Sequence, residues 1–172
     1  MELGRFLSRF RPLVPVHAVF DLEFLTLFLL YLTVRWTPDV YKRQPMFWCD
    51  YGCHIRMGSH IEINHNCVIL DCAPVTFGDH VLIGPNCGFY TAGHPIEAAA
   101  RNAGLEFARP ITVGDSVWFG GSVSVLPGVT IGSGAVIGAG SVVSRDIPPN
   151  VVAAGDPCRV LRPIHPGGAE EA

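Results

Sequence analysis

A bulky apolar residue recurs every six positions in the second half of this chain, and that period constrains the fold more than any other feature. Twelve positions share the spacing, and the last six follow one another without a slip: Met57, Ile63, Ile69, Phe77, Ile83, Phe89, Val113, Phe119, Val125, Ile131, Ile137 and Val143. A helix repeats every ~3.6 residues and a half-buried strand every ~2, so neither produces this spacing. A six-residue repeat is typical of a parallel β-helix, in which each repeat contributes one short strand and one corner.

The repeat also predicts which side chains point inward and how many coils form. The residue four positions after an apolar one is expected inside the prism, and nine such residues are small or β-branched: Cys67, Ala73, Val81, Cys87, Val117, Val123, Val129, Ala135 and Ser141. Glycine directly follows seven of the twelve apolar residues, which we interpret as the place where the chain turns and where glycine tolerates a positive φ. Three repeats make one coil, so we expect four coils and a prism roughly 20 Å tall.

Composition narrows the class of protein. The chain has 172 residues, of which 49% are hydrophobic and 16% charged, with a net charge of −3. This length predicts one domain with extensions, and the negative charge argues against a nucleic-acid binder. The six cysteines contain no CxxC pair, and we interpret them as small residues of a protein in a reducing cytoplasm.

The two ends of the chain do not follow the repeat. Residues 1–44 include an uncharged apolar stretch at 24–34, which is too short to span a membrane and lacks a clear signal-peptide cleavage site. We expect residues 1–44 to be a helical extension that covers an end of the prism, or a segment not native to the domain. The domain itself is expected at 45–164, with Pro148-Pro149 ending the regular winding and 165–172 forming a disordered tail.

A long insertion interrupts the repeat and carries a histidine at its start. The period is lost at 93–110 and resumes in register at Val113, after a smaller two-residue insertion at 73–74. Long loops that leave a regular scaffold are usually functional. A hydroxyl group needs a general base to become a nucleophile at pH 7, and His94 has the residue type for that task. From the residues alone, a surface histidine packed on its neighbours remains an alternative.

The other histidines suggest a different chemistry, which we weigh against a simpler interpretation. His54, His60, His65 and His80 lie within one stretch of the repeat, and trimeric proteins of the γ-carbonic-anhydrase type bind zinc through three histidines. His54, His60 and His80 occupy positions that are expected to face outward. We therefore favour solvated surface histidines and expect no metal.

Six motifs occur in order between Pro45 and Ile164: FWCDYG, NHNCVILD, IGPN, TAGHP, PITVGDSVWFGG and PGVTIGSGAVIGAGSVVSRDIPPNVVAAGDPCRV. Together they resemble the maltose and galactoside O-acetyltransferase family of hexapeptide-repeat acetyltransferases, over about 120 of the 172 residues. The resemblance implies an all-β, left-handed parallel β-helix with an extruded loop. It also implies homotrimers with active sites between subunits, and direct transfer of acetyl from acetyl-CoA to a sugar hydroxyl without a metal. Residues 1–44 depart from the polar helical start that is usual in the family.

The same resemblance implies roles for individual residues. His94, in the GHP motif, matches the catalytic base, and Asp50, Asn64 and Asp71 match the region that holds the acceptor. The positions that match the acetyl-CoA groove are Trp118, Gly121, Ala139, Arg145, Arg159 and Arg162. A backbone N–H near Gly121 could stabilise the thioester oxyanion, and the arginines suit phosphates. Corner caps, a trimer contact for Trp118 and solvated arginine charges remain the structural alternatives.

The leading hypothesis is therefore an acetyl-CoA-dependent O-acetyltransferase that acts on a sugar-like acceptor. An antibiotic, serine or a nodulation-type oligosaccharide is the alternative acceptor. Two further alternatives are a zinc-dependent protein of the γ-carbonic-anhydrase kind and a catalytically silent scaffold prism.

Overall fold

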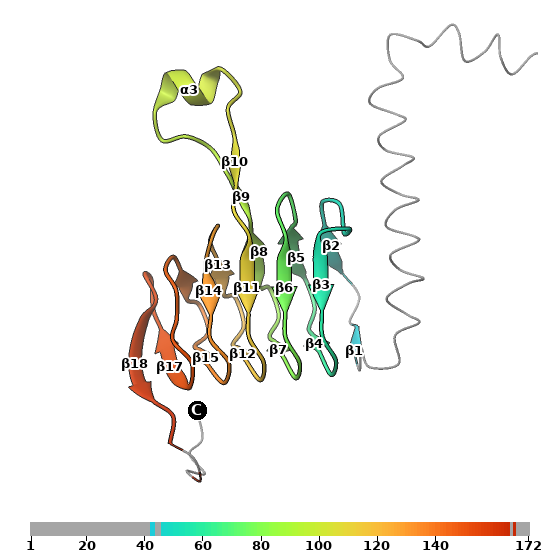
Figure 1. The fold of residues 1–172 in the computed structure, drawn as a ribbon, viewed down its shortest axis with the longest axis vertical. Coiled ribbons are helices and arrows are strands. Elements are labelled where there is room, and N and C mark those ends of the chain that lie inside the picture. Colours follow the sequence, from blue (N-terminus) through green and yellow to red (C-terminus); the bar gives the residue numbers. More distant parts are fainter. Residues whose placement is uncertain (1–41, 44–45, 166, 168–172) are drawn as a thin grey trace, which may run out of the picture. The chain divides into compact units, whose positions relative to one another are not determined.

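The computed structural model describes residues 42–43, 46–165 and 167, all within the compact unit Thr37–Ala172. The expected helical extension over 1–44 thus lies outside the described residues except for Lys42 and Arg43, which form a short strand. Most of the expected tail at 165–172 also lies outside them. Within the described part, nearly all regular structure is strand (Figure 1). No helix in this part is both long and apolar enough to cross a bilayer.

Apart from a two-stranded pair on the extruded loop, the described strands form three sheets, which we name A, B and C. Sheet A contains, in spatial order, β1 (Lys42–Arg43), β4 (Glu62–Ile63), β7 (Leu82–Ile83), β12 (Trp118–Phe119), β15 (Val136–Ile137), β17 (Val151–Ala154) and β18 (Arg159–Pro163). Sheet B contains β2 (Phe47–Cys49), β5 (Cys67–Leu70), β8 (Gly88–Tyr90), β13 (Ser124–Val125) and β16 (Val142–Val143). Sheet C contains β3 (Ile55–Met57), β6 (Val75–Phe77), β11 (Ile111–Val113) and β14 (Thr130–Ile131).

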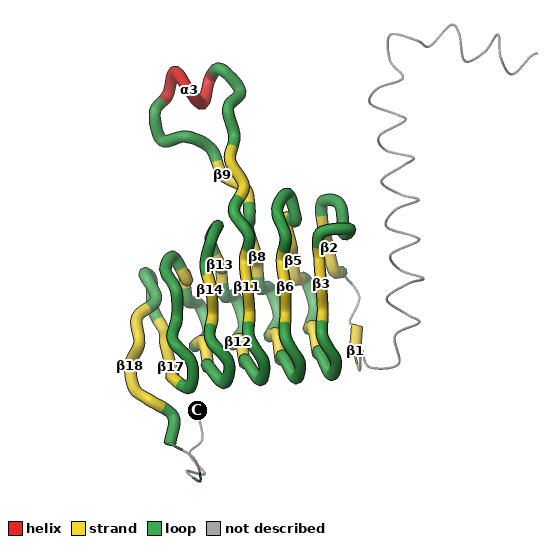
Figure 2. The backbone as a smooth tube through the Cα atoms, in the orientation of Figure 1, coloured by secondary structure: helices red, strands yellow, loops and turns green. Residues whose placement is uncertain are grey.

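Successive strands of the three sheets, from β1 to β17, belong to different sheets, so the chain winds as a parallel β-helix. It passes through sheets B, C and A in turn and then repeats (Figure 2). Equivalent positions of neighbouring coils pair in register, as when Phe119 pairs with Ile83 on one side and Ile137 on the other. Among the described strands of the three sheets, only β18 is antiparallel to its neighbour. The expected parallel β-helix is confirmed.

The extruded loop is also confirmed. Strands β9 (Ala92–Gly93) and β10 (Phe107–Ala108) form an antiparallel pair that leaves the coil between β8 and β11. A short helix, α3 (Ala98–Asn102), lies between them at the far end of the loop (Figure 1). We call residues 91–110 the arm.

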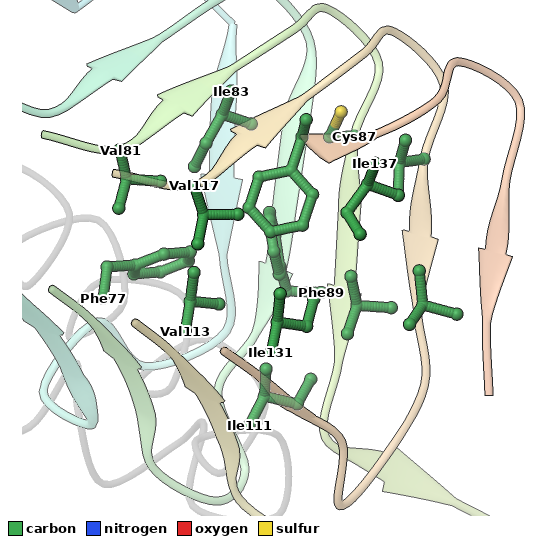
Figure 3. Close-up of a cluster of buried hydrophobic side chains, with 14 of the residues drawn as sticks. Phe77, Val81, Ile83, Cys87, Phe89, Ile111, Val113, Val117, Ile131 and Ile137 are labelled. Atoms are coloured by element: carbon green, nitrogen blue, oxygen red, sulfur yellow. The ribbon is translucent and has the colours of Figure 1, made fainter. Parts of the chain in front are cut away.

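The interior of the prism is filled as the repeat predicts. Eleven of the twelve repeated apolar residues and all nine inward residues four positions later are buried, and Met57 is half-buried. Phe77, Phe89 and Phe119 come from the three different sheets, and the Phe89 ring contacts the other two edge to face, with centroids 5.0 Å from Phe77 and 5.3 Å from Phe119. The aliphatic side chains pack around these rings (Figure 3).

The expected positive φ at the glycines that follow the apolar residues is wrong. Positive φ occurs two residues later, at His60, Asn66, His80, Asn86, Ser116, Ser122, Gly128, Gly134, Gly140 and Asn150. The seven glycines are instead places of close approach between coils. A Cβ on Gly84, for example, would lie 2.7 Å from the backbone nitrogen of Gly121 and 2.8 Å from the carbonyl carbon of Gly120.

The expectation of four coils is also wrong, because the winding extends beyond the strict repeat at both ends. Five strands stack in sheet B and six parallel strands in sheet A. At the start, β2 pairs with β5 and places Cys49 in register with Ile69. Cys49 therefore acts as an earlier inward position, although the sequence step from it to Met57 is eight residues (57 − 49).

At the other end, Pro148-Pro149 does not end the winding. The step from Val143 shortens to four residues, so that Ile147 bridges Ile131, and the six-residue step then resumes at Ala153, which pairs with Ile137. The two prolines occupy a corner, where their missing N–H groups cost no strand hydrogen bonds.

Candidate active site

The corner between sheets B and C carries insertions in three successive coils. The step between the inward residues of these sheets is six after Val125 and four after Val143, but it is eight after Cys49 and after Ile69, and 24 after Phe89 (49 to 57, 69 to 77, 89 to 113). Because Cys49, Ile69 and Phe89 pair in register, the three insertions leave the prism at one edge. Segments that are far apart in sequence thus meet there.

His94 lies on the arm, one residue beyond β9. The β9–β10 register pairs Ala92 with Ala108 and Gly93 with Phe107. The His94 side chain is 58% exposed, and its Nδ1 lies 3.8 Å from Oε1 of Glu106. The arrangement leaves the imidazole accessible while it faces a carboxylate.

The root of the arm is held by a buried threonine. The Thr91 hydroxyl donates to the carbonyl oxygen of Leu70 at 2.6 Å and accepts from the N–H of Ala73 at 3.0 Å. The Thr91 carbonyl accepts from the N–H of Arg109 at 2.8 Å, which closes the arm. Thr91 is completely buried, so its hydrogen bonds fix the direction in which the arm leaves the prism.

Asp71 is completely buried and binds backbone groups of the preceding coil. Its carboxylate accepts from the N–H of Tyr51 at 2.8 Å and from the N–H of His54 at 3.2 Å. The Asp71 carbonyl oxygen lies 2.7 Å from Nδ1 of His54. In this chain Asp71 thus holds the turn over residues 50–54, next to the corner that bears the arm.

Asp50 and the arm share an acidic neighbourhood around Cys72. The Cys72 thiol donates to Oδ2 of Asp50 at 3.5 Å. Burial, this hydrogen bond and the negative charges of Asp50, Asp71 and Glu106 raise the pKa of the Cys72 thiol. The negative charges that act on this thiol therefore come from the first coil, the second coil and the arm, which lie near one another at the surface.

Asn64 lies at a different corner, between sheets A and B, together with Gly121 and Ala139. Its Oδ1 accepts from the N–H of His65 at 2.8 Å and lies 2.7 Å from Nδ1 of the same residue. A Cβ on Gly121 would be 3.4 Å from its nearest neighbour, the carbonyl oxygen of Pro85, so a small side chain would make ordinary van der Waals contacts there. Within one chain, the structure therefore separates Asn64 from His94.

Most of the remaining candidate residues lie on the outer face of sheet A. Register places Leu82, Trp118, Val136 and Val152 in one row, with Arg162 opposite Val152. Leu82 and Trp118 are 46% and 43% exposed. Arg159 is also on β18, where it donates to the carbonyl oxygen of Cys158 at 2.8 Å. Arg145 is exposed at the corner after β16, apart from this row.

Comparison with known proteins identifies the family that has this architecture. The bacterial transferase hexapeptide family (six repeats) matches residues 110–145. A crystal structure of a hexapeptide-repeat-containing acetyltransferase from Vibrio cholerae is 39% identical, with a TM-score of 0.73, and the match covers 86% of this chain and 93% of that one. This chain belongs to the hexapeptide-repeat acetyltransferases. A structure of the Vibrio protein complexed with acetyl-CoA matches at 48% identity and a TM-score of 0.71, over 72% of this chain and 68% of that one.

Two curated members of the family are also close in sequence. Nodulation protein L of Rhizobium meliloti is 54% identical over 68% of this chain and 64% of its own length. Galactoside O-acetyltransferase of Escherichia coli is 49% identical over 71% of this chain and 60% of its own length. The chain spans 58–64% of the length of four curated relatives that it matches, these two among them. The expected resemblance to maltose and galactoside acetyltransferases is confirmed.

Three of the other histidines lie on the surface, and two of them stack on each other. His60 and His80 stack with ring centroids 4.6 Å apart and an interplanar angle of 15°, both at corner positions with positive φ. As expected, His54, His60 and His80 are exposed. In the part of the chain that the structure describes, no group of three or more His, Cys, Asp or Glu side chains is arranged to hold a metal ion.

Three residues of the site were not assigned a role from the sequence. Thr91 is the first residue of the TAGHP motif but was given no role, and Cys72 and Glu106 lie outside the six motifs. Glu106 follows from the pairing across the arm. The N–H of Arg109 donates to the carbonyl oxygen of Thr91, so the residues three positions further along each strand, His94 and Glu106, face each other. Cys72 and Thr91 act through contacts between coils, which give no local signal in the sequence.

Proposed function

We propose that this protein is an acetyl-CoA-dependent O-acetyltransferase that transfers an acetyl group to a hydroxyl of a sugar-like acceptor. The observation that carries the proposal is His94, an accessible imidazole 3.8 Å from Glu106 on an arm anchored beside the corner of Asp50 and Asp71. The names of the relatives support the class of reaction, since one is a galactoside O-acetyltransferase and another was solved with acetyl-CoA.

In this mechanism His94 acts as the general base. Its imidazole accepts the proton of the acceptor hydroxyl while that oxygen attacks the thioester carbonyl carbon. The carbon–sulfur bond then breaks, and the imidazolium returns the proton to the leaving thiolate, so the products are an acetyl ester and free CoA. A positioned base contributes roughly 10²–10⁴ in rate. Asp50, with Asp71 holding its turn, would accept hydrogen bonds from acceptor hydroxyls.

The described residues fit acetyl-CoA at the corner between sheets A and B. In the two coils that carry Gly121 and Ala139, these residues contribute no large side chain to the corner, and a Cβ on Gly121 would have only ordinary contacts. The row from Leu82 to Val152 offers an apolar surface beside it, with Trp118 half-exposed. Arg145, Arg159 and Arg162 would bind phosphate groups, which guanidinium recognises bidentately. A backbone N–H near Gly121 would stabilise the oxyanion.

We propose further that the active protein is a homotrimer. In one chain, Asn64 and the acetyl-CoA corner are separate from His94, so a complete site requires a neighbour that brings the two corners together. The outer faces support this assembly, because the row of sheet C is polar throughout, whereas the rows of sheets A and B contain large apolar residues and only a few polar ones such as Glu62 and Ser124. The polar row is Arg56, Thr76, Thr112 and Thr130, and the apolar residues are Leu82, Trp118, Val136, Trp48, Val68 and Val142.

We also propose a cytoplasmic location. None of the six cysteines, all of which lie among the described residues, forms a disulfide, and unoxidised cysteines persist in reducing compartments.

The test is CoA release from acetyl-CoA with a panel of acceptors: galactosides, maltose, glucose, chitooligosaccharides, serine and chloramphenicol. Wild type should release CoA only with an acceptor, and His94→Ala should lower the rate by about 10²–10⁴. His80→Ala, an exposed histidine at another corner, is the matched control and should keep wild-type activity. If a folded protein releases no CoA with any acceptor, or if His94→Ala retains full activity, the proposal is wrong.

A further inference from the structure

We propose that Glu106 is a positioning residue that holds the His94 imidazole in the tautomer with its proton on Nδ1. This inference rests on the proposed role of His94 as the general base. In this tautomer Nε2 keeps its lone pair and can accept the acceptor's proton.

The backbone register of the arm brings the two side chains together. Strands β9 and β10 pair Ala92 with Ala108 and Gly93 with Phe107. The next cross-strand pair outward is therefore His94 with Glu106, and their side chains are 3.8 Å apart from Nδ1 to Oε1. Directly opposed residues of an antiparallel pair have side chains close enough to interact.

Packing at the neighbouring pair holds this register. A Cβ on Gly93 would lie 2.7 Å from Cζ of Phe107, so the Phe107 ring lies against the glycine backbone. The Arg109 guanidinium lies 5.4 Å from the centroid of the same ring. Together with the Thr91 anchor, these contacts place His94 and Glu106 just beyond a defined pair of strands.

The other charged residues of the arm are engaged elsewhere. Glu97 caps α3 and accepts from the N–H of Ala99 at 2.8 Å and of Ala100 at 2.6 Å. Arg101 donates to the carbonyl oxygens of Pro95 and Ile96, both at 3.0 Å. Within the described arm, Glu106 is thus the carboxylate that faces His94.

The chemistry explains why a carboxylate at this position matters. An ionised carboxylate only accepts hydrogen bonds, so it pairs with Nδ1 when that nitrogen carries the proton. The neutral ring has a single N–H, and Nε2 is then the basic atom. After proton transfer, the same carboxylate stabilises the imidazolium. The separation of 3.8 Å is an ion-pair distance for the protonated ring and is longer than a hydrogen bond for the neutral one. Catalytic hydrogen bonds are often long without substrate and tighten when substrates bind.

Kinetics of three variants provide the first test. Glu106→Ala should lower kcat about tenfold or more, a part of the 10²–10⁴ that a positioned base contributes, with KM for acetyl-CoA within about twofold of wild type. Glu106→Gln keeps an acceptor oxygen and should recover part of the loss. Glu97→Gln removes the same charge from the same arm and should keep wild-type kcat.

Nitrogen NMR of histidine-labelled full-length protein provides the second test, and it does not depend on activity. At pH 8.5, above the ordinary histidine pKa of about 6.5, the His94 signals, assigned with His94→Asn, should show the proton on Nδ1 in wild type and Glu106→Gln. In Glu106→Ala this preference should be lost.

An unchanged kcat in Glu106→Ala overturns the inference. So does an unchanged His94 spectrum, even if kcat falls. If wild type transfers acetyl to no acceptor, the proposed function fails, and the spectrum alone decides whether Glu106 sets the tautomer.

Discussion

Two adjacent glycines show that a residue type can serve different purposes within one repeat. A Cβ on Gly120 would lie 2.6 Å from the backbone nitrogen of Ala139, whereas a Cβ on Gly121 would meet its nearest atom at 3.4 Å. Neither residue is among those with positive φ. Gly120 is therefore required by the spacing between coils, and Gly121 is not.

These two positions make a matched stability prediction. Gly120→Ala should lower the free energy of unfolding by about 1–3 kcal/mol, because the obstructing atoms are backbone and cannot move aside. Gly121→Ala should change it by less than about 0.5 kcal/mol. Urea unfolding followed by circular dichroism measures both. Equal losses of stability in the two variants would contradict the proposed close packing.

At the scale of elements, the arm depends on its root. Helix α3 has no buried residues, and Ile96 and Leu105 on the arm are 97% and 56% exposed. The outer arm therefore has little packing of its own within one chain. Its described attachments are the β9–β10 pairing and the hydrogen bonds of buried Thr91. The position of His94 consequently depends on the hydrogen bonds of Thr91, three residues earlier in the chain.

Thr91→Val tests this dependence, with Thr91→Ser as the matched control. Valine has nearly the same shape but leaves the buried N–H of Ala73 without its partner, which should cost about 1–3 kcal/mol of unfolding free energy. Because the arm then loses its fixed direction, acetyl transfer by Thr91→Val should fall mainly in kcat. Serine keeps the hydroxyl and should retain most of the stability and activity. Unfolding curves and steady-state rates would decide, and a fully active Thr91→Val would contradict the anchor role.

At the scale of the whole molecule, the three outer faces differ in polarity. Sheet C presents threonines such as Thr112, whereas sheet A presents Leu82 and Trp118, which are nearly half-exposed. Exposed apolar patches on soluble proteins commonly mark interfaces. The proposed trimer would cover the apolar faces and leave sheet C in water.

A charge introduced on each outer face should distinguish a face that is covered in the trimer from one that stays in water. Leu82→Glu should shift the protein from trimers to smaller species, because the carboxylate would be buried without a partner. Thr112→Glu, at the outer face of sheet C, should leave the assembly unchanged. Sedimentation velocity of folded variants measures the size of each. A wild-type monomer, or identical assembly in both variants, would contradict the trimer.

Much of the candidate site was predictable from the sequence, and the exceptions have physical causes. His94 could be singled out because it starts an insertion in a strict period. The buried position of Asp71 could not, because its carboxylate accepts N–H groups of Tyr51 and His54 from the preceding coil. Glu106 also depends on pairing across the arm. The number of coils was underestimated because two steps of irregular length still keep register with their neighbours.

The sequence by itself determined the period, the inward residues and the place where the arm leaves the prism. These follow from local spacing, since each six-residue unit must bury the same two positions. Only the tertiary structure decided which residues meet at one edge. The insertions at 50–54, 71–74 and 91–110 are separate in the chain, and they adjoin because Cys49, Ile69 and Phe89 stack in register. Contacts between coils also explain why positions such as Gly84 and Gly120 require glycine, since a Cβ there would meet backbone atoms of the next coil.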